Sequence, residues 1–191
     1  TATTRVLVEA TNNAMAILYP VTLFDLTVGG GAGRASVTAY APLTVNDDMA
    51  ILDKGTLALN RPSVVRNGLY VLEGGTLTHS ENTTNEVNKL DVTVLGNVCV
   101  DANGSVDVTG RGYAPGYGPG TASGASHGGR GGTHYSSGPD VGPCYGSIMA
   151  PTNLGSGGGN SAGGGAILFR VAGSFRNDGL ILANGNFMKP D

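Results

Sequence analysis

This chain of 191 residues has little charge, few aromatic rings and almost no helix signal. Charged residues make up 13% of it, and the net charge is −3. Phosphate-dependent binding of nucleic acids requires clustered Lys and Arg, whereas the eleven basic residues here are scattered. Arg111 and Arg130 lie among glycines and tyrosines, as in glycine–arginine RNA-binding segments, but two arginines are too few for that mechanism. We therefore expect no nucleic-acid partner.

Long hydrophobic runs are also missing. The best uncharged apolar run, 10–24, contains Asn12, Asn13 and Pro20 and is too short and interrupted to cross a bilayer. We expect no membrane insertion. Hydrophobic residues are 40% of the chain but aromatic ones only 6%, which indicates an interior of Val, Leu and Ala. The length is sufficient for one domain with an adequate core.

Short runs of alternating apolar residues are present in place of helices. Valines alternate through 92–100 and recur at Val106 and Val108, on either side of two turns. From Ala166 onward the same plan returns: a strand, a glycine, a short strand, an Asn-Asp-Gly turn and another strand. This alternation with a period of two is typical of β-strands.

A glycine begins each of several similar units. Gly55-Thr-Leu-Ala-Leu, Gly75-Thr-Leu-Thr-His and Gly104-Ser-Val-Asp-Val align, and Gly179 starts a fourth unit. An interval near twenty residues, lengthened by insertions, is typical of a solenoid. The sequence predicts an all-β fold, a right-handed parallel β-helix forming a single domain over 1–191, with 1–42 as an N-terminal cap or the first turns.

The stretch 110–166 contains 20 of the 33 glycines and three charged side chains. Alone, this composition would suggest a flexible linker, because glycine loses much backbone entropy on ordering. Similar strand units flank the stretch, so we interpret it as a glycine-rich insertion between turns of the β-helix. The glycines of 29–33 and 155–159 lack the features of phosphate-binding loops and are interpreted as corners. Local packing into polyproline-II strands, which need glycine at close contacts, is an alternative for the tract.

The insertion contains side chains suited to ligand recognition. Tyrosines stack on sugars, and cationic groups bind carboxylates. The predicted ligand-binding residues are Tyr113, Tyr117, His127, Arg130, His134 and Tyr135. His127 and His134, with Asp140, could also form a metal or acid–base site. The usual metal-ligand spacings are missing and a glycine-rich backbone supports ligands poorly, so we expect no metal and a structural role for these histidines.

Carboxylate pairs raise a second chemical hypothesis. Paired Asp or Glu residues can hydrolyse glycosidic bonds. Asp47 and Asp48, however, sit in an Asn-Asp-Asp sequence typical of turns, where Asp is favoured for its hydrogen bonds to backbone. We interpret them as turn residues. Calcium at such a turn is an alternative, although the repeat of calcium-binding β-rolls is missing; no other cofactor is expected.

Two cysteines and one sequon bear on the compartment. In an oxidising environment Cys99 and Cys144 could form a disulfide worth roughly 4 kcal/mol, and otherwise they are unrelated thiols. Asn82-Thr-Thr is a potential glycosylation site. With little Lys and Glu and abundant Thr, Asn and Gly, these features favour an extracellular or cell-surface protein. The start at a threonine, without a leader, fits a mature or excised portion.

The order of glycine motifs also suggests a family. The chain resembles the glycine-rich β-helix modules of very large secreted bacterial surface proteins over roughly 65–185, through Gly-Arg-Gly-Tyr (110–113), Gly-Tyr-Gly-Pro-Gly (116–120), Ser-His-Gly-Gly-Arg-Gly-Gly (126–132), Gly-Ser-Gly-Gly-Gly (155–159) and Gly-Gly-Gly-Ala-Ile-Leu (163–168). The resemblance implies an extracellular solenoid with an adhesive or scaffold role. It supplies no catalytic residues.

Two functions remain open. The first is a non-catalytic structural or adhesive subunit, whose C-terminal strand edge is covered by another subunit, a swapped N-terminal strand or other parts of a larger surface protein. The second is a polysaccharide-binding or polysaccharide-cleaving β-helix that acts through the glycine-rich loop. Cleavage would make it a lyase or glycoside hydrolase, but the carboxylate cluster and base that such an enzyme commonly needs cannot be placed. We therefore favour the non-catalytic function.

Overall fold

The computed structural model describes residues 4–9, 11–122, 124–132 and 141–187. The single domain expected over 1–191 is seen as two compact units. Unit 1 comprises Thr1–Ser80, Leu90–Asp107 and Leu168–Leu182, and unit 2 comprises Glu81–Lys89, Val108–Ile167 and Ala183–Asp191.

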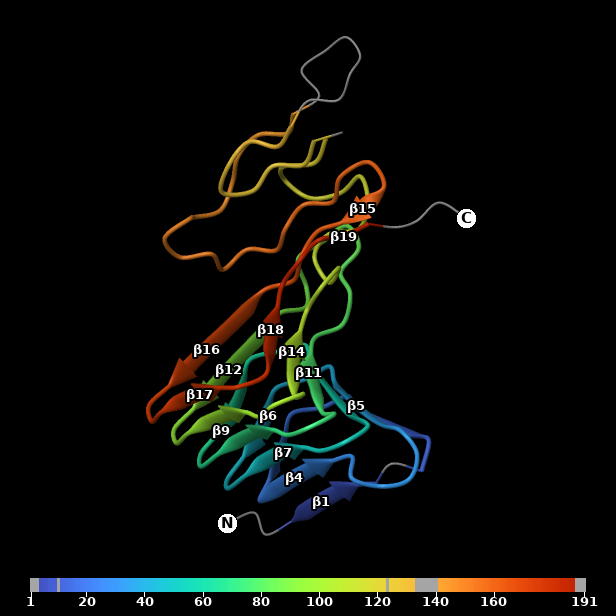
Figure 1. The fold of residues 1–191 in the computed structure, drawn as a ribbon, viewed down its shortest axis with the longest axis vertical. Helices are drawn as coiled ribbons and strands as arrows, with labels where there is room; N and C mark the ends of the chain where they lie inside the picture. Colours follow the sequence, from blue (N-terminus) through green and yellow to red (C-terminus); the bar gives the residue numbers. More distant parts are fainter. Residues whose placement is uncertain (1–3, 10, 123, 133–140, 188–191) are drawn as a thin grey trace. The chain divides into compact units, whose positions relative to one another are not determined.

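Unit 1 is built from three parallel sheets of stacked strands (Figure 1). The first sheet contains β1 (Arg5–Val8), β4 (Asp25–Val28), β7 (Met49–Ile51), β10 (Leu69–Val71), β13 (Val98–Val100) and β17 (Phe175–Asn177). The second contains β2 (Asn13–Ile17), β5 (Ala35–Ala39), β8 (Gly55–Leu59), β11 (Thr76–Thr78), β14 (Ser105–Asp107) and β18 (Leu180–Leu182). The third contains β3 (Val21–Leu23), β6 (Leu43–Val45), β9 (Ser63–Val65), β12 (Leu90–Val94) and β16 (Ile167–Val171).

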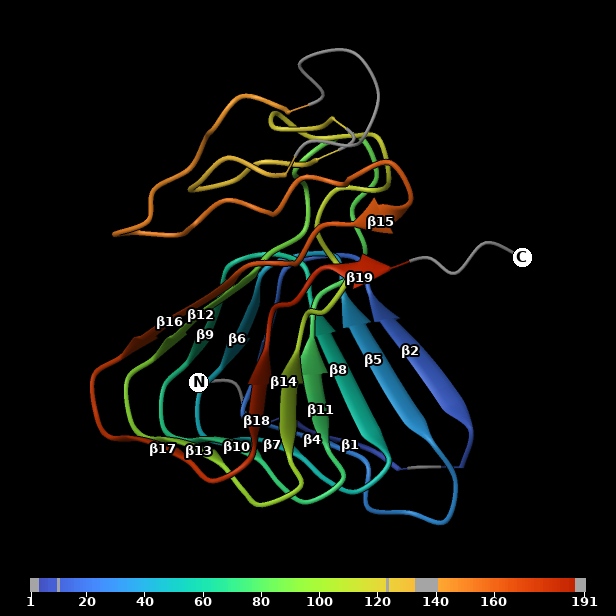
Figure 2. The same cartoon turned by 45° about the horizontal axis from the view of Figure 1, so that its top comes forward.

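Each turn of the chain adds one strand to each sheet in the same order (Figure 2). The strands β1, β2 and β3 form one turn, and β4, β5 and β6 pair with them in parallel as the next. The segment for which a cap or first turns were expected therefore supplies β-helix strands from Arg5 onward. The predicted all-β parallel β-helix is confirmed, with sheets that do not close.

Apolar residues stack in register through the interior of unit 1. We call two such stacks the first column and the second column. The first column contains Val6, Leu26, Met49, Leu69, Val98 and Phe175. The second column contains Met15, Val37, Leu57, Leu77, Val106 and Ile181. The inner members of both are at most 1% exposed, so the alternation in the sequence does mark the core face.

Glycines form the corner between the first and second sheets. A Cβ on Gly55 would lie 2.2 Å from the Val28 oxygen, and one on Gly104 would lie 2.4 Å from the Val71 oxygen. Before these glycines, Lys54 and Asn103 have positive φ values of 59° and 62°. Each turn passes so close to the previous backbone that no side chain fits, which explains the glycine repeat.

Polar residues stack at the corner between the third and first sheets. The Asn67 amide donates to Asp47 Oδ1 at 2.9 Å, and the Gly68 N–H donates to Asp48 Oδ1 at 2.9 Å. Both donors lie twenty residues further along the chain. The two aspartates therefore join successive turns of the helix, in addition to forming their own turn.

Unit 2 is built from three segments inserted at equivalent places in the chain. The segment Glu81–Lys89 follows β11, Val108–Ile167 follows β14, and the segment from Ala183 follows β18. The strands β11, β14 and β18 all belong to the second sheet. Within unit 2, β15 (Ser161–Ala162) pairs antiparallel with β19 (Asn186–Phe187). The predicted glycine-rich insertion thus forms a compact unit with two further segments.

Direct backbone contact holds the glycine segments of unit 2 together. Gly112 N–H donates to the Gly163 oxygen at 2.8 Å, and Gly155 N–H donates to the Gly164 oxygen at 2.9 Å. A Cβ on Gly163 would lie 1.8 Å from the Gly155 oxygen. Polyproline-II packing, the alternative considered for the tract, requires the same close approach of glycine backbones.

No helix in the described part of the chain could span a membrane.

Candidate functional site

The segment 81–89, which we call the strap, is anchored by Asn82. This residue is 5% exposed. Its Nδ2 donates to the Asn88 and Arg111 oxygens at 2.9 and 2.8 Å, and its Oδ1 accepts from the Val87 and Asn88 N–H groups at 2.9 and 2.8 Å. These bonds use the full capacity of the amide. A glycan at this potential acceptor would displace the hydrogen bonds of the buried Asn82 amide, so we expect Asn82 to stay unmodified in the folded protein.

Glu86 fixes the other end of the strap. It forms an ion pair with Lys89, and its Oε2 accepts from the Leu154 N–H at 3.3 Å. Lys89 Nζ also donates to the Thr152 oxygen at 2.6 Å. Besides burial, the charge of Glu86 also acts on the Tyr113 hydroxyl and helps to raise its pKa. The strap is therefore joined to two distant parts of the glycine tract.

Tyr113, predicted to stack on a ligand, belongs to the core of unit 2. It is 7% exposed and clusters with Leu154 and Ala166. Burial raises the pKa of its hydroxyl, and the negative charge of Glu86 adds to the effect. A buried ring cannot form a platform for a sugar, so its predicted binding role is corrected to a packing role.

A chain of hydrogen bonds continues from this core. Ser156 Oγ donates to Tyr145 Oη at 2.9 Å, and Tyr145 Oη donates to the Leu154 oxygen at 2.5 Å. Burial raises the pKa of Tyr145, opposed by the Ser156 hydrogen bond. The edge of the His127 ring meets Tyr145 with 4.7 Å between centroids and an interplanar angle of 87°. His127 Nε2 is buried and has no hydrogen-bond partner among the described residues.

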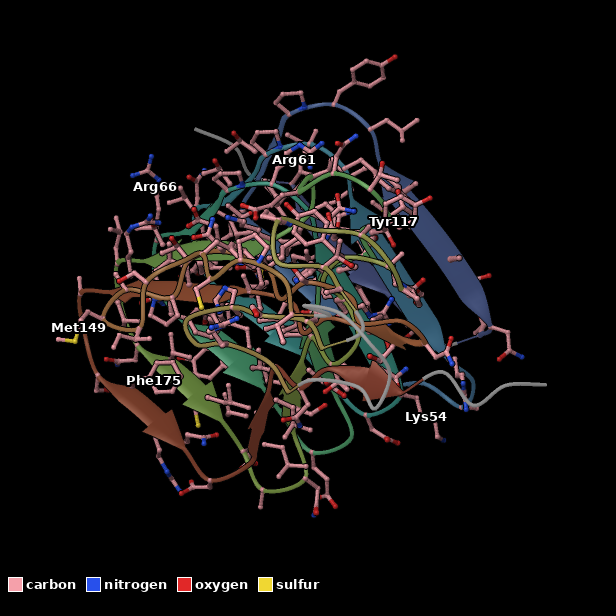
Figure 3. All side chains as sticks on the ribbon, turned by 90° about the horizontal axis from the view of Figure 1, so that it is seen from above. Lys54, Arg61, Arg66, Tyr117, Met149 and Phe175 are labelled. Atoms are coloured by element: carbon pink, nitrogen blue, oxygen red, sulfur yellow. The ribbon has the colours of Figure 1, made fainter. Side chains whose placement is uncertain are left out.

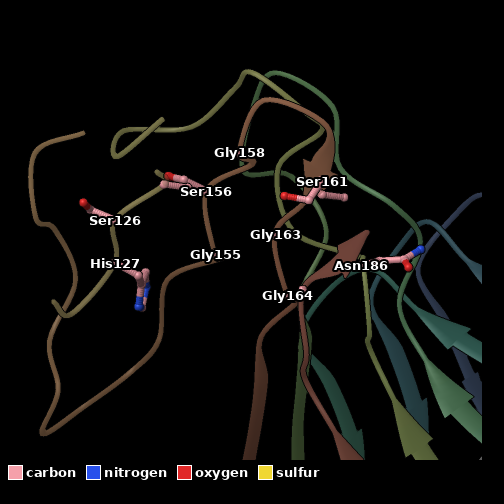
Figure 4. Close-up of a pocket in the computed structure, with 12 residues that line it drawn as sticks. Ser126, His127, Gly155, Ser156, Gly158, Ser161, Gly163, Gly164 and Asn186 are labelled. Carbon is pink, nitrogen blue, oxygen red and sulfur yellow. The ribbon is translucent and has the colours of Figure 1, made fainter. Parts of the chain in front are cut away.

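His127 lies on the wall of a cavity of about 520 Å³ within unit 2 (Figure 4). Ser126 and His127 lie on one side, and Ser161 and Asn186 lie on the other, next to the β15–β19 pair. The remaining lining consists of small residues: Ala125, Gly155, Ser156, Gly158, Ala162, Gly163, Gly164 and Gly185. No carboxylate, Lys or Arg side chain is among these lining residues.

The other residues of the predicted ligand-binding set do not line this cavity. Tyr117 is 49% exposed and Arg130 is exposed, both outside the cavity lining. His134 and Tyr135 lie outside the described residues. Of the described members, only His127 contributes to the cavity. Ser161 and Asn186 were missed because nothing local marks them; they meet through the pairing of short strands distant in sequence.

The structure also places the residues of the disulfide and metal hypotheses. Cys99 and Cys144 are free thiols, half-buried and exposed respectively, and the disulfide stays a prediction. Among the residues the structure describes, no group of three or more His, Cys, Asp or Glu side chains could hold a metal ion. Calcium binding at the Asp47–Asp48 corner stays a prediction.

The two ends of unit 1 form a second candidate surface. At one end, Phe175 and Ile181 are 42% and 40% exposed, although their register places them in the columns of the core. Figure 3 labels Phe175, whose ring lies 5.6 Å from that of Phe169. At the other end, Met15 and Leu7 are 36% and 59% exposed.

The arrangement can therefore do two things: extend a β-helix at its ends, and accept a small molecule in a neutral polar cavity. Neither requires a catalytic group. Comparisons with models of protein families, with curated proteins and with solved structures find no match for this chain.

Proposed function

We propose that this chain is a non-catalytic, extracellular structural subunit that assembles head to tail through the ends of its β-helix. The observation that carries the proposal is the exposure of core-type residues at both ends of the columns. The inner members of the second column are fully buried, whereas its first and last members, Met15 and Ile181, are 36% and 40% exposed. One further turn at either end would bury them.

A second copy of the chain is the occupant that fits both ends. If the parallel register continued, Met15 of the next copy would lie on Ile181, and Val6 of the next copy would lie on Phe175. The first and second sheets have six strands each and the third has five, so the first two sheets are the ones that would continue directly into the next copy. An apolar residue would then meet an apolar residue in each column, which favours association.

The backbone supports the same arrangement. Strands at the ends of a parallel stack offer N–H and C=O groups on their outer edges, and such edges pair readily with other strands. Pairing of one end with the opposite end is heterologous and does not close, so it produces a filament rather than a dimer. This is the scaffold role implied by the resemblance to glycine-rich β-helix modules of secreted proteins.

Polysaccharide cleavage has less support. The cavity lining carries no carboxylate, and Tyr113 is buried. Glycosidases and lyases need positioned acids or bases at the bond they cleave. A polysaccharide could be bound without being cleaved, and such binding would be independent of assembly.

Charge placed at one end tests the assembly. Ile181→Asp and Met15→Asp should each stop growth, because an unpaired carboxylate would be buried in the contact. Light scattering coupled to size exclusion, with electron microscopy, should show filaments for the parent chain and monomers for each variant. The matched control is Leu95→Asp, which replaces an apolar residue that is 49% exposed and belongs to neither column, and it should still assemble.

Mixing the two variants distinguishes head-to-tail from symmetric contact. Each variant keeps the end that the other has lost, so an equimolar mixture should form a discrete dimer that grows no further. A parent chain that stays monomeric at high concentration would overturn the proposal. A dimer formed by Ile181→Asp alone would show a symmetric contact and would also overturn it.

A further inference from the structure

The cavity of unit 2 has no part in end-to-end assembly. From its lining we infer a binding site for a neutral, polyhydroxylated ligand, namely a saccharide of one or two sugar units. The cavity volume of about 520 Å³ lies within the range of small-molecule sites. This inference does not depend on the proposed assembly.

The lining residues include no Lys, Arg or carboxylate side chain, and this favours one class of ligand. The side chains that could form hydrogen bonds are Ser126, His127, Ser156, Ser161 and Asn186, and the other lining residues are glycines and alanines. An anion would lose its water without gaining a Lys or Arg partner, and a cation would find no carboxylate. Transfer into such a site is therefore more favourable for a neutral polar molecule.

The polar side chains of the cavity differ in how many of their hydrogen bonds are already made. Ser126 and Ser156 have protein partners: Ser126 Oγ donates to the Gly142 oxygen at 2.6 Å, and Ser156 Oγ accepts from the Gly120 N–H at 2.9 Å. His127 Nε2 is buried, and a Cβ on Gly146 would lie 2.9 Å from it. His127 therefore contributes to the wall of the cavity without offering this nitrogen to a ligand.

The opposite wall offers unused groups. Ser161 Oγ and the side-chain amide of Asn186 form no hydrogen bond to the residues that the structure describes, and both line the cavity (Figure 4). An amide and a hydroxyl can each donate and accept. Sugar hydroxyls have the same dual capacity. A saccharide in the cavity would therefore find its unused hydrogen-bond partners at Ser161 and Asn186.

The backbone makes part of the wall rigid before binding. Gly155 N–H donates to the Gly164 oxygen at 2.9 Å, and Tyr113 N–H donates to the Gly155 oxygen at 3.0 Å. A Cβ on Gly164 would lie 2.1 Å from the Ala183 oxygen, so this segment is packed directly on its neighbour. A preformed wall lowers the entropy lost when a ligand is bound.

Titration of the complete chain with neutral sugars tests the inference. The probes are glucose, galactose, N-acetylglucosamine and their disaccharides, added to ¹⁵N-labelled protein while amide and imidazole signals are followed by NMR. At least one probe should shift the amides of Gly155, Gly163 and Gly164 and the ring signals of His127. Galacturonate, glucosamine and inorganic phosphate, added at equal concentration, should shift them much less.

Two variants assign the contacts. Asn186→Ala and Ser161→Ala remove side chains that form no hydrogen bond to the residues described by the structure. Each should weaken binding about tenfold, the effect of losing one well-placed hydrogen bond. Arg130→Ala is the matched control and should bind as the parent does. Binding unchanged in both variants, equal shifts with charged probes, or no shift with any neutral sugar would each overturn the inference.

Discussion

Two kinds of glycine occur in this protein, and they differ in what a side chain would meet. At Gly163 a Cβ would lie 1.8 Å from the Gly155 oxygen. At Gly159, four residues earlier, a Cβ would meet nothing within 4 Å. The first kind is required by packing of backbone on backbone, and the second is not.

Alanine at these two positions should therefore have opposite results. We expect Gly163→Ala to destabilise the protein by about 3 kcal/mol, because the backbone of unit 2 must move apart. Gly159→Ala should be neutral or slightly stabilising, since it reduces the entropy of the unfolded chain. Urea denaturation followed by circular dichroism measures both. Equal effects of the two substitutions would show that the close contact at Gly163 does not exist.

Asn82 has a structural role that its local sequence does not indicate. Replacement by Ala removes the hydrogen bonds that this side chain forms with the Val87 and Asn88 N–H groups and with the Arg111 oxygen. We expect Asn82→Ala to cost about 3 kcal/mol and to accelerate hydrogen exchange at Val87 and Asn88. The exposed Asn85 provides the control, and Asn85→Ala should change neither quantity. Protein from a glycosylating host should carry no glycan on Asn82, as mass spectrometry can check.

At the scale of elements, the stacked strands and the strap follow different rules. The strands repeat with alternating apolar residues, and neighbours in the columns pair at fixed register. The strap has no such pattern; Glu86 and Lys89 reach residues more than sixty positions away. Repetition made the strands predictable from sequence, whereas the partners of the strap depend on the fold.

The buried tyrosines near the contact between strap and tract should make the stability of the protein depend on pH. The pKa values of Tyr113 and Tyr145 are raised above the ordinary 10.0, mainly by burial and partly by Glu86. The unfolded chain therefore loses these protons first as the pH rises. The stability from the buried neutral hydroxyls is fully present below pH 10.0 and is lost as the pH rises through the folded-state values.

Absorbance at the wavelength of tyrosinate measures this effect. Tyr113 and Tyr145 should titrate above the ordinary value of 10.0. Glu86→Gln should move both titrations toward the ordinary value without reaching it, because burial is the larger cause. Glu81→Gln, at an exposed strap residue, is the control and should leave both titrations unchanged. Titration of Tyr113 and Tyr145 at the ordinary value would contradict their buried positions.

At the scale of the whole molecule, the chain alternates between two units. It leaves the strands of unit 1 after β11, β14 and β18, each time after a strand of the second sheet, and enters unit 2. The proposed assembly uses the ends of unit 1, and the inferred ligand site is the cavity of unit 2. Separate substitutions should therefore change the two properties independently.

Assembly should make the stability of the molecule depend on concentration. Association of folded chains stabilises them by mass action, and for a chain of this length we expect the Tm to rise by about 3 °C for each tenfold increase in concentration. Ile181→Asp should remove this dependence. Scanning calorimetry under reducing conditions measures it, since a reductant prevents the exposed Cys144 from cross-linking copies. A Tm independent of concentration in the parent chain would contradict end-to-end assembly.

Patterns along the chain were enough to predict the parallel β-helix and the core face of its strands, and they marked Gly55, Gly75 and Gly104 as the starts of repeating units. These features repeat at short intervals, and each follows from local geometry: a period of two in strands, and no room for Cβ at a close turn. The insertion of the glycine tract was also predictable, because similar strand units flank it.

The contacts of the glycine tract depend on the fold and could not be predicted from local patterns. It buried Tyr113, filled the hydrogen bonds of Asn82, and brought Ser161 and Asn186 together across a cavity from His127. The physical reason is that these contacts join the strap, the tract and the segment after β18, which lie far apart in the chain. No repeating pattern in the sequence indicates which of the many similar glycines contact each other in the folded protein.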